Sequence, residues 1–97
     1  MDLSNTSIES LGNLTSVEGD LFLHDTPLKS LGNLKSVGGD LDLQNTSIKS
    51  FENLTSVGGY LDLWGTPLSR KYTERSTLFV ATDQIRQIVN VGGDIIL

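Results

Sequence analysis

Cysteine is absent from the 97 residues, and only two prolines and six aromatic side chains are present. Without cysteine the chain can form no disulfide and no thiolate metal site. Cysteine usage therefore does not indicate whether the protein works in an oxidising or a reducing compartment. No stretch approaches 18 consecutive apolar residues, so no segment is expected to span a membrane. The first residues, MDLSNTSIES, lack the basic start and apolar core of a secretory signal. We therefore expect a cytoplasmic protein if the sequence is complete.

Positive charge is also scarce. Seven Lys and Arg residues stand against 12 acids, which gives a formal net charge of -5. Binding to nucleic acid requires Lys and Arg to neutralise phosphates, so no direct nucleic-acid partner is expected. The balance favours a cationic partner, or a surface that imitates a polyanion. The length fits one domain.

The chain repeats itself every 20 residues. Residues 1–20, 21–40 and 41–60 align without gaps; the first and second blocks share 11 of 20 residues, as do the second and third. A fourth block begins at Leu61, and its motif resumes as VNVGGDIIL at the C-terminus, 14 residues late. A fixed period of this kind indicates a solenoid, whose stacked units bury a shared core. We interpret residues 1–97 as one domain whose final repeat, 61–97, carries an insertion at about 69–90.

Each block places apolar residues at the same six positions. In the second block these are Leu21, Leu23, Leu28, Leu31, Leu34 and Val37. The first two alternate as in a strand, and the others recur about every third residue, as in a tight coil. The invariant threonines are expected to turn inward and bond loop backbone: Thr6, Thr26, Thr46 and Thr66. The second glycine of each pair never varies, whereas Glu18 replaces the first, so only the second is expected to need a close contact or a positive φ.

These motifs resemble a known repeat family. The pattern LxLxxTxI/LxS is similar to the leucine-rich repeat consensus LxLxxNxL, with Thr in the Asn position. NLTSVGG followed by LDL resembles the receptor-L-domain type of repeat, LTSIGGxLxI, and short leucine-rich proteins of bacteria and their phages. The resemblance covers residues 1–69 and 89–97. It implies a mainly β or α/β solenoid with one parallel sheet of about five strands, used for protein recognition; the period is short for the family, and no flanking caps are evident.

The insertion, SRKYTERSTLFVATDQIRQIVN, breaks the period. Thr82 or Asp83 is predicted to cap a helix that runs to about Val89, with Ile85, Ile88 and Val89 on its apolar face. The preceding STLFVAT could be a strand, a continuation of the helix or a projecting loop. The insertion is expected to cap the solenoid, and a partner-binding arm is the alternative. Four of the seven bases lie in it: Arg70, Lys71, Arg75 and Arg86.

The residues beside the inward leucines form an outward strand face. Its three rows are Asp20, Asp40, Tyr60, Asp94; then Asp2, Phe22, Asp42, Asp62, Ile96; then Ser4, His24, Gln44, Trp64. Six of the 12 acids and none of the seven bases lie in these rows. Parallel strands are about 4.8 Å apart, so Asp42 and Asp62 should be neighbours. Their repulsion is roughly 1–3 kcal/mol before salt screening, which a fold optimised for stability alone would avoid.

This face is the predicted binding site. Its residues are Asp20, Phe22, His24, Asp40, Asp42, Gln44, Tyr60, Asp62, Trp64 and Asp94. Aromatic rings among carboxylates suit Lys and Arg side chains, so the predicted partner is a basic protein. Two other interpretations remain open. The acids can be a product of duplication that keeps the sheet soluble, or they can hold Ca²⁺, although no calcium-loop spacing is present.

Catalytic chemistry finds no support in the sequence. His24 is the only histidine, and its neighbour Asp25 is expected on the opposite side of the strand. No serine lies in a nucleophile elbow, and VGGD precedes a strand instead of opening a helix, so there is no phosphate loop. We predict a protein that is not an enzyme and has no cofactor and no metal site.

The terminal repeats are the last feature to interpret. Met1 occupies an inward position, as do Ile95 and Leu97, and an uncapped rung leaves apolar groups and backbone unpaired. The sequence thus predicts either a longer array or a homodimer through the terminal rungs. The functional prediction is a non-catalytic recognition module for a basic protein. The alternatives are a phage-type inhibitor that imitates a polyanion to block a host nucleic-acid-binding or defence protein, and a structural segment of a larger surface or tail protein.

Overall fold

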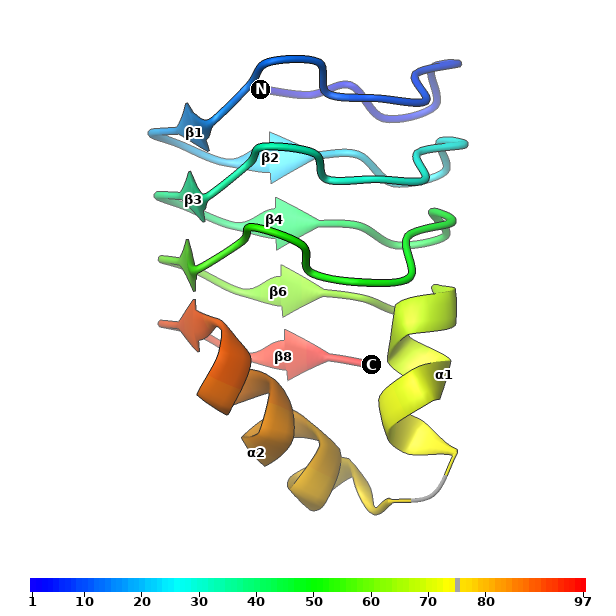
Figure 1. Cartoon of the computed structure of the whole chain (residues 1–97), viewed down its shortest axis with the longest axis vertical. Coiled ribbons are helices and arrows are strands. Elements are labelled where there is room, and N and C mark those ends of the chain that lie inside the picture. The colour runs from blue at the N-terminus through cyan, green and yellow to red at the C-terminus, as the bar shows by residue number, and fades with distance from the viewer. Residues whose placement is uncertain (75) are drawn as a thin grey trace.

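A computed structural model describes residues 1–74 and 76–97 of the chain, so Arg75 of the predicted basic group lies outside the described residues. The chain winds into a stack of rungs, with the N-terminus at one end and two helices at the other (Figure 1). Every strand has two residues. The strands are β1 (Ser16–Val17), β2 (Leu21–Phe22), β3 (Ser36–Val37), β4 (Leu41–Asp42), β5 (Ser56–Val57), β6 (Leu61–Asp62), β7 (Asn90–Val91) and β8 (Ile95–Ile96).

The strands form two parallel sheets of four, in the orders β1-β3-β5-β7 and β2-β4-β6-β8. A repeat protein built from short parallel strands is confirmed, but the prediction of one sheet with about five strands is wrong. The second sheet comes from the Ser-Val pair before each glycine turn, which is too short to show a periodicity. The expected first strand at Met1–Leu3 is reduced to one bridge between Asp2 and Phe22, because the first rung has a neighbour on one side only.

Register follows the 20-residue repeat. Leu21 pairs with Leu41, which pairs with Leu61, and the insertion is skipped when Leu61 pairs with Ile95. The six predicted inward positions are buried in the second and third rungs, where Leu21, Leu31 and Leu41 are each 0% exposed. The core is therefore one continuous column of aliphatic side chains between the rungs, with Phe51 as its one aromatic member.

The threonine prediction is confirmed. Thr26, Thr46 and Thr66 are buried, and each hydroxyl donates to the carbonyl of the leucine three residues earlier at 2.7–2.8 Å. Thr6 makes the same bond in a more exposed setting. Because a buried carbonyl without a partner costs about 1–3 kcal/mol, one hydroxyl per rung closes the turn after each strand.

Both glycines have tight surroundings in the pairs at 38–39, 58–59 and 92–93, so the expectation that only the second does is wrong; Gly19, in the first rung, has open space around it. A Cβ on Gly58 would lie 2.0 Å from the Gly38 carbonyl oxygen, and one on Gly59 would lie 1.9 Å from Oδ1 of Asp40. Neither glycine has a positive φ. Glu18 is tolerated at the first position because its rung is the first of the stack, and no preceding carbonyl of this chain faces it.

A residue with a left-handed backbone conformation follows the strand segment of each block. The fifth residue of every block has a positive φ: Asn5, Asp25, Asn45 and Gly65, between 57° and 77°. Asn, Asp and Gly are the residues that adopt this conformation most readily. The recurrence of Asn, Asp and Gly at the fifth repeat position is the sequence signal for this conformation.

The insertion forms two helices where one was predicted. Helix α1 (Pro67–Thr73) starts at Thr66, whose hydroxyl accepts from the Ser69 amide, with Pro67 in the first turn. Thr26-Pro27 begins no helix in the second block. The difference lies further along, where Leu31 and Gly32 of that block are replaced by Lys71 and Tyr72, and the coil loses both its inward anchor and its turn glycine.

Helix α2 (Leu78–Ile88) begins five residues earlier than predicted. Its N-cap is Thr77, so of the segment STLFVAT the part LFVAT is a continuation of the helix. The apolar face is Ala81, Ile85 and Val89; Ile88 is 51% exposed, against the prediction. The helix covers the C-terminal end of the core, as expected for a cap.

Arg86 completes this cap. In the stack, the carbonyls of Val57 and Gly59 accept from the amides of Gly92 and Gly93 in the next rung, at 2.9 Å each. At the last rung the guanidinium of Arg86 takes the place of those amides, with Nη1 2.8 Å from the Val91 oxygen and Nη2 2.8 Å from the Gly93 oxygen. The side chain thus satisfies the two carbonyls that a further rung would have used.

Candidate protein-binding face

The structure places the predicted site residues along the sheet β2-β4-β6-β8 and its flanks. In the second row Phe22 pairs with Asp42, Asp42 with Asp62, and Asp62 with Ile96. The predicted neighbours Asp42 and Asp62 therefore do lie on adjacent strands. The face is a set of parallel rows, which we call the strand face and define by the ten predicted residues together with Asp2.

Exposure varies along the strand face. Trp64 is 53% exposed, whereas Phe22 and Tyr60 are partly buried. Asp62 is only 8% exposed, because the side chains of its neighbours cover it. Asp20 and Asp94 are exposed, and Asp40 and Asp42 are half-buried. The indole of Trp64 is the largest apolar group that the face offers to a partner.

Each carboxylate of the second row has a local structural role that the sequence did not reveal. Oδ1 of Asp2, Asp42 and Asp62 accepts the amide two residues later, on Ser4, Gln44 and Trp64, at 3.0 Å in each case. This bond forms a turn at the end of the strand, just before the residue that has a positive φ. This role explains the choice of Asp at the position, and it uses one of the two carboxylate oxygens. In Asp62 the other oxygen, Oδ2, accepts from Nε2 of Gln44 at 3.0 Å.

Carboxylates of the first row join the rungs. Oδ1 of Asp20 accepts the amide of Asp40 at 2.7 Å, and Oδ1 of Asp40 accepts the amide of Tyr60 at 2.9 Å. Asp94 is the last member of this row, after Tyr60, and the described chain has no further amide for it. One oxygen of Asp20 and of Asp40 therefore remains free to face solvent.

Electrostatics on the face reflect the lack of countercharge. Burial raises the pKa of Asp42 above the ordinary value of a carboxyl, and the neighbouring charge of Asp62 raises it further. The pKa of Tyr60 is also raised, first by burial and then by the charges of Asp42 and Asp40. Within residues 1–74 and 76–97, the one ion pair found is between His24 and Asp25, so no Lys or Arg of that part neutralises these acids.

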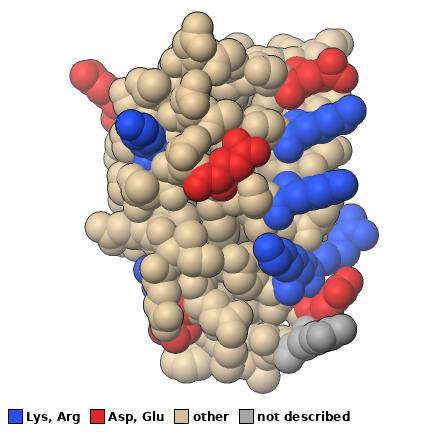
Figure 2. All heavy atoms as spheres, viewed as in Figure 1, with Lys and Arg blue, Asp and Glu red and all other residues tan. Residues whose placement is uncertain are grey.

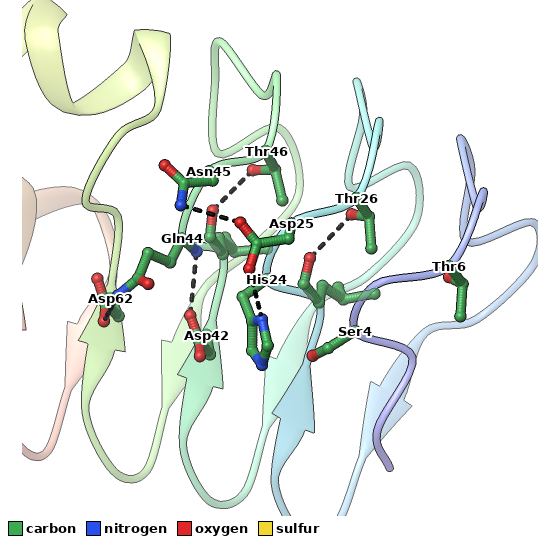
Figure 3. A network of polar contacts seen from close by, with 12 residues as sticks. Ser4, Thr6, His24, Asp25, Thr26, Asp42, Gln44, Asn45, Thr46 and Asp62 are labelled. Atoms are coloured by element: carbon green, nitrogen blue, oxygen red, sulfur yellow. Dashed lines mark hydrogen bonds and ion pairs between the residues drawn. The ribbon is translucent and has the colours of Figure 1, made fainter.

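His24 lies differently from its prediction. Its Nδ1 is 3.0 Å from Oδ2 of Asp25, so the two side chains are on the same side (Figure 3). The left-handed φ of 57° at Asp25 ends the strand geometry and turns the carboxylate back toward the ring. The hydrogen bond to Asp25 raises the pKa of His24, and the charge of Asp42 acts in the same direction. Asp25 also accepts from Nδ2 of Asn45, which ties this pair to the next rung.

The bases gather elsewhere. Figure 2 shows Lys and Arg side chains one above another along the edge of the molecule on which α1 lies. Lys29 and Lys49 border one shallow hollow with Pro67, and Arg70 and Lys71 border the adjoining one. The sequence predicted the insertion, with four of the seven bases, as the basic end; the recurring Lys at the ninth repeat position (Lys29, Lys49) is the signal that extends this charge along the edge of the rungs.

Other kinds of site were sought in the same part of the chain. Its His, Asp and Glu side chains contain no group of three that could hold a metal ion. None of its helices combines the length and apolar character that crossing a membrane requires. Comparisons with protein-family models, with curated proteins and with solved structures found no match to this chain.

Proposed function

We propose that the chain is a non-catalytic recognition module, akin to short leucine-rich repeats, that binds a basic protein through the strand face. The observation that carries the proposal is the column of Asp40, Asp42 and Asp62 beside Trp64. Each of these carboxylates satisfies backbone with one oxygen, and none is paired with a Lys or Arg of the described residues. Asp62 is the least accessible of the three, since its second oxygen accepts from Gln44, so Asp40 and Asp42 offer the more open carboxylates. Adjacent like charges cost stability, and a cationic partner would relieve that cost.

The geometry suits Lys and Arg in particular. Carboxylates of successive rungs are spaced by about 4.8 Å, so neighbouring acids can share one guanidinium or ammonium group. The exposed indole of Trp64 adds a surface for cation–π contact, which favours Arg over Lys. The basic edge with Lys29 and Lys49 belongs to another part of the surface. The molecule is therefore strongly polarised, which assists oriented encounter with a cationic partner.

A pull-down from lysate with matched variants tests the proposal. The site variant carries Asp40, Asp42 and Asp62 changed to Asn, together with Trp64→Ala. Asn keeps an oxygen for the backbone bonds, so the fold is expected to persist. The control carries Glu9, Glu18 and Glu74 changed to Gln, together with Phe79→Ala, which makes the same change of charge and removes one exposed aromatic elsewhere.

Retention of a basic protein by the wild type and the control, but not by the site variant, is the expected result. Equal retention by all three would mean that the acids only keep the sheet soluble. Circular dichroism and thermal unfolding establish that all three are folded. Affinity for the captured partner should fall steeply with added salt, because the contact is between opposite charges.

Imitation of a polyanion is the second candidate, and the two rows of carboxylates favour it. If the partner binds DNA or RNA through the same residues, nucleic acid will compete with the chain for it. A partner that binds both at once would exclude this candidate. The alternative of a structural segment predicts no saturable binding at the strand face.

The homodimer predicted through the terminal rungs is also kept as a proposal, for the N-terminal end. There Leu3, Ile8, Leu11 and Leu14 are only partly buried, although their counterparts in the next rung are fully buried. Two copies facing each other at these side chains would bury them. Light scattering over a range of concentrations, with Leu11→Lys as the disrupting variant, tests this association.

A further inference from the structure

We infer that the outer edge of β8 and helix α2 together form a docking groove for one extended segment of a partner protein. The segment runs parallel to β8. It carries apolar side chains at two alternate positions and a basic residue directly before the first of them. The groove shares only Asp94 with the strand face, and the inference does not depend on the proposed function.

The first step is the difference between the two halves of the last rung. On the β7 side, the guanidinium of Arg86 already satisfies the carbonyls of Val91 and Gly93. On the β8 side nothing in the described chain does the same. A complete further rung, including one from a second copy, would have to displace Arg86 and α2. A single extended strand would not.

The second step is the set of backbone groups along β8. In each earlier rung, the amides at the first and third positions donate to the next rung: Leu61 to the Asp94 oxygen at 2.8 Å, and Leu63 to the Ile96 oxygen at 2.7 Å. The equivalent amides of the last rung are those of Ile95 and Leu97, and among the described residues they have no acceptor. An exposed strand edge of this kind is a template for strand addition.

The third step is the carboxylate of Asp94. Its counterparts Asp20 and Asp40 accept the amide of the residue that opens the next rung. Asp94 is exposed and makes no ion pair within residues 1–74 and 76–97. An incoming segment can supply that amide. A Lys or Arg side chain at the same position would complement the carboxylate, which is why the segment is assigned a basic residue there.

The fourth step is the groove wall formed by α2, in which Leu78 is the apolar residue beside the polar Thr82 and Arg86. Leu78, Thr82 and Arg86, one turn apart on α2, line a groove of about 530 Å³ whose other side is residues 94–97. Leu78 is 63% exposed and Ile96 is 40% exposed. In the solenoid, side chains at the first and third positions point inward, so those of an added strand would meet the α2 wall. The volume lies within the range of about 300–1,000 Å³ that is common for ligand sites.

Selection from a library of random peptides displayed on phage, with the 97-residue chain as bait, tests the inference. The expected peptides share the pattern basic–apolar–any–apolar. Leu97→Pro removes the outward amide, which has no partner among the described residues, and Leu97→Val controls for the shortened side chain. Leu78→Glu places a charge on the groove wall, and Phe79→Glu places one beside it on a residue that does not line the groove.

Binding of the selected peptides should weaken at least about tenfold in Leu97→Pro and in Leu78→Glu, and stay within about twofold in the two controls. The amides of Ile95 and Leu97 should become protected from hydrogen exchange when peptide is bound. Peptides without the pattern, or equal binding to Leu97→Pro, would overturn the inference. So would a concentration-dependent dimer of the chain alone that Leu97→Pro abolishes, since the occupant would then be a second copy.

Discussion

The first rung and the second rung share 11 of 20 residues, yet they differ in how well they bury the same side chains. Leu31 is fully buried, whereas Leu11, at the same repeat position, is only partly covered. The second rung has a neighbour on each side, and the first has one. The comparison shows that burial in this fold is a property of the pair of rungs that enclose a side chain, as expected for a one-dimensional stack.

The largest expected effect follows from this difference in burial. Leu31→Ala should lower the free energy of unfolding by about 3–5 kcal/mol, because it opens a cavity between two rungs that cannot collapse onto each other. Leu11→Ala should cost about 1 kcal/mol. Urea unfolding followed by circular dichroism measures both. Equal losses would show that the first rung is covered in solution, which would support the N-terminal homodimer.

The glycine turn gives the next contrast. Gly58→Ala would place a methyl group 2.0 Å from the Gly38 carbonyl oxygen, which is backbone and cannot move aside. The rungs would have to separate, at a cost of about 2–3 kcal/mol. Glu18→Ala, at the same position of the first rung, should change stability by less than about 0.5 kcal/mol. A small effect of Gly58→Ala in thermal unfolding would mean that the two turns are further apart in solution than the contact between Gly58 and Gly38 implies.

Threonine offers a smaller test of the same comparison. Thr46→Val keeps the shape but removes the hydroxyl, one of two donors to the buried carbonyl of Leu43; the Thr46 amide at 3.2 Å remains, so the cost should be about 1 kcal/mol. Thr6→Val makes the same change in the exposed first rung, where water can replace the hydroxyl, and should cost less than about 0.5 kcal/mol. The measurement is again the urea midpoint. Equal losses in the two variants would contradict the idea that water replaces the Thr6 hydroxyl in the first rung.

The smallest effect concerns Asp2 and Asp42, which share a repeat position. The hydrogen bond from the Ser4 amide lowers the pKa of Asp2, whereas burial and the charge of Asp62 raise the pKa of Asp42. A raised carboxyl pKa means that stability is lost as the pH rises through it. Asp42→Asn should therefore stabilise the fold slightly at pH 7, and not below the ordinary carboxyl pKa. NMR titration of the two carboxyl carbons should find Asp42 above Asp2; the reverse order would contradict this account.

Much of the fold could be predicted from the sequence, because a strict repeat multiplies each weak signal. The inward positions, the buried threonines and the pairing of Asp42 with Asp62 all follow from residues that recur at fixed places. The second sheet could not be predicted, since a Ser-Val pair carries no periodicity of its own. Helix α1 was missed for another reason: Thr66-Pro67 looks like Thr26-Pro27, and only the later loss of Leu and Gly separates the two.

The strand face was predicted as a set of rows, and its internal bonding was not. The sequence could show that acids recur beside the strands, but it could not show that Asp42 accepts the Gln44 amide or that Asp40 accepts the Tyr60 amide. Those bonds depend on the left-handed turn after each strand and on the rung spacing, which exist only once the chain has folded. The end groove likewise depends on Arg86. Its guanidinium bonds the two carbonyls that a further rung would use, and the repeat pattern alone would predict such a rung.

The glycine pair also governs how such a chain can grow by gene duplication. A copy of residues 21–40 inserted after residue 40 carries both glycines, so its turn would fit beneath the rung before it. A copy of residues 1–20 inserted at the same place would carry Glu18 into the interior, with its Cβ as close to a backbone carbonyl as a Cβ at Gly58 would be. Lengthening of the array by internal duplication is therefore open to the second block and closed to the first, unless Glu18 is replaced by glycine in the same event.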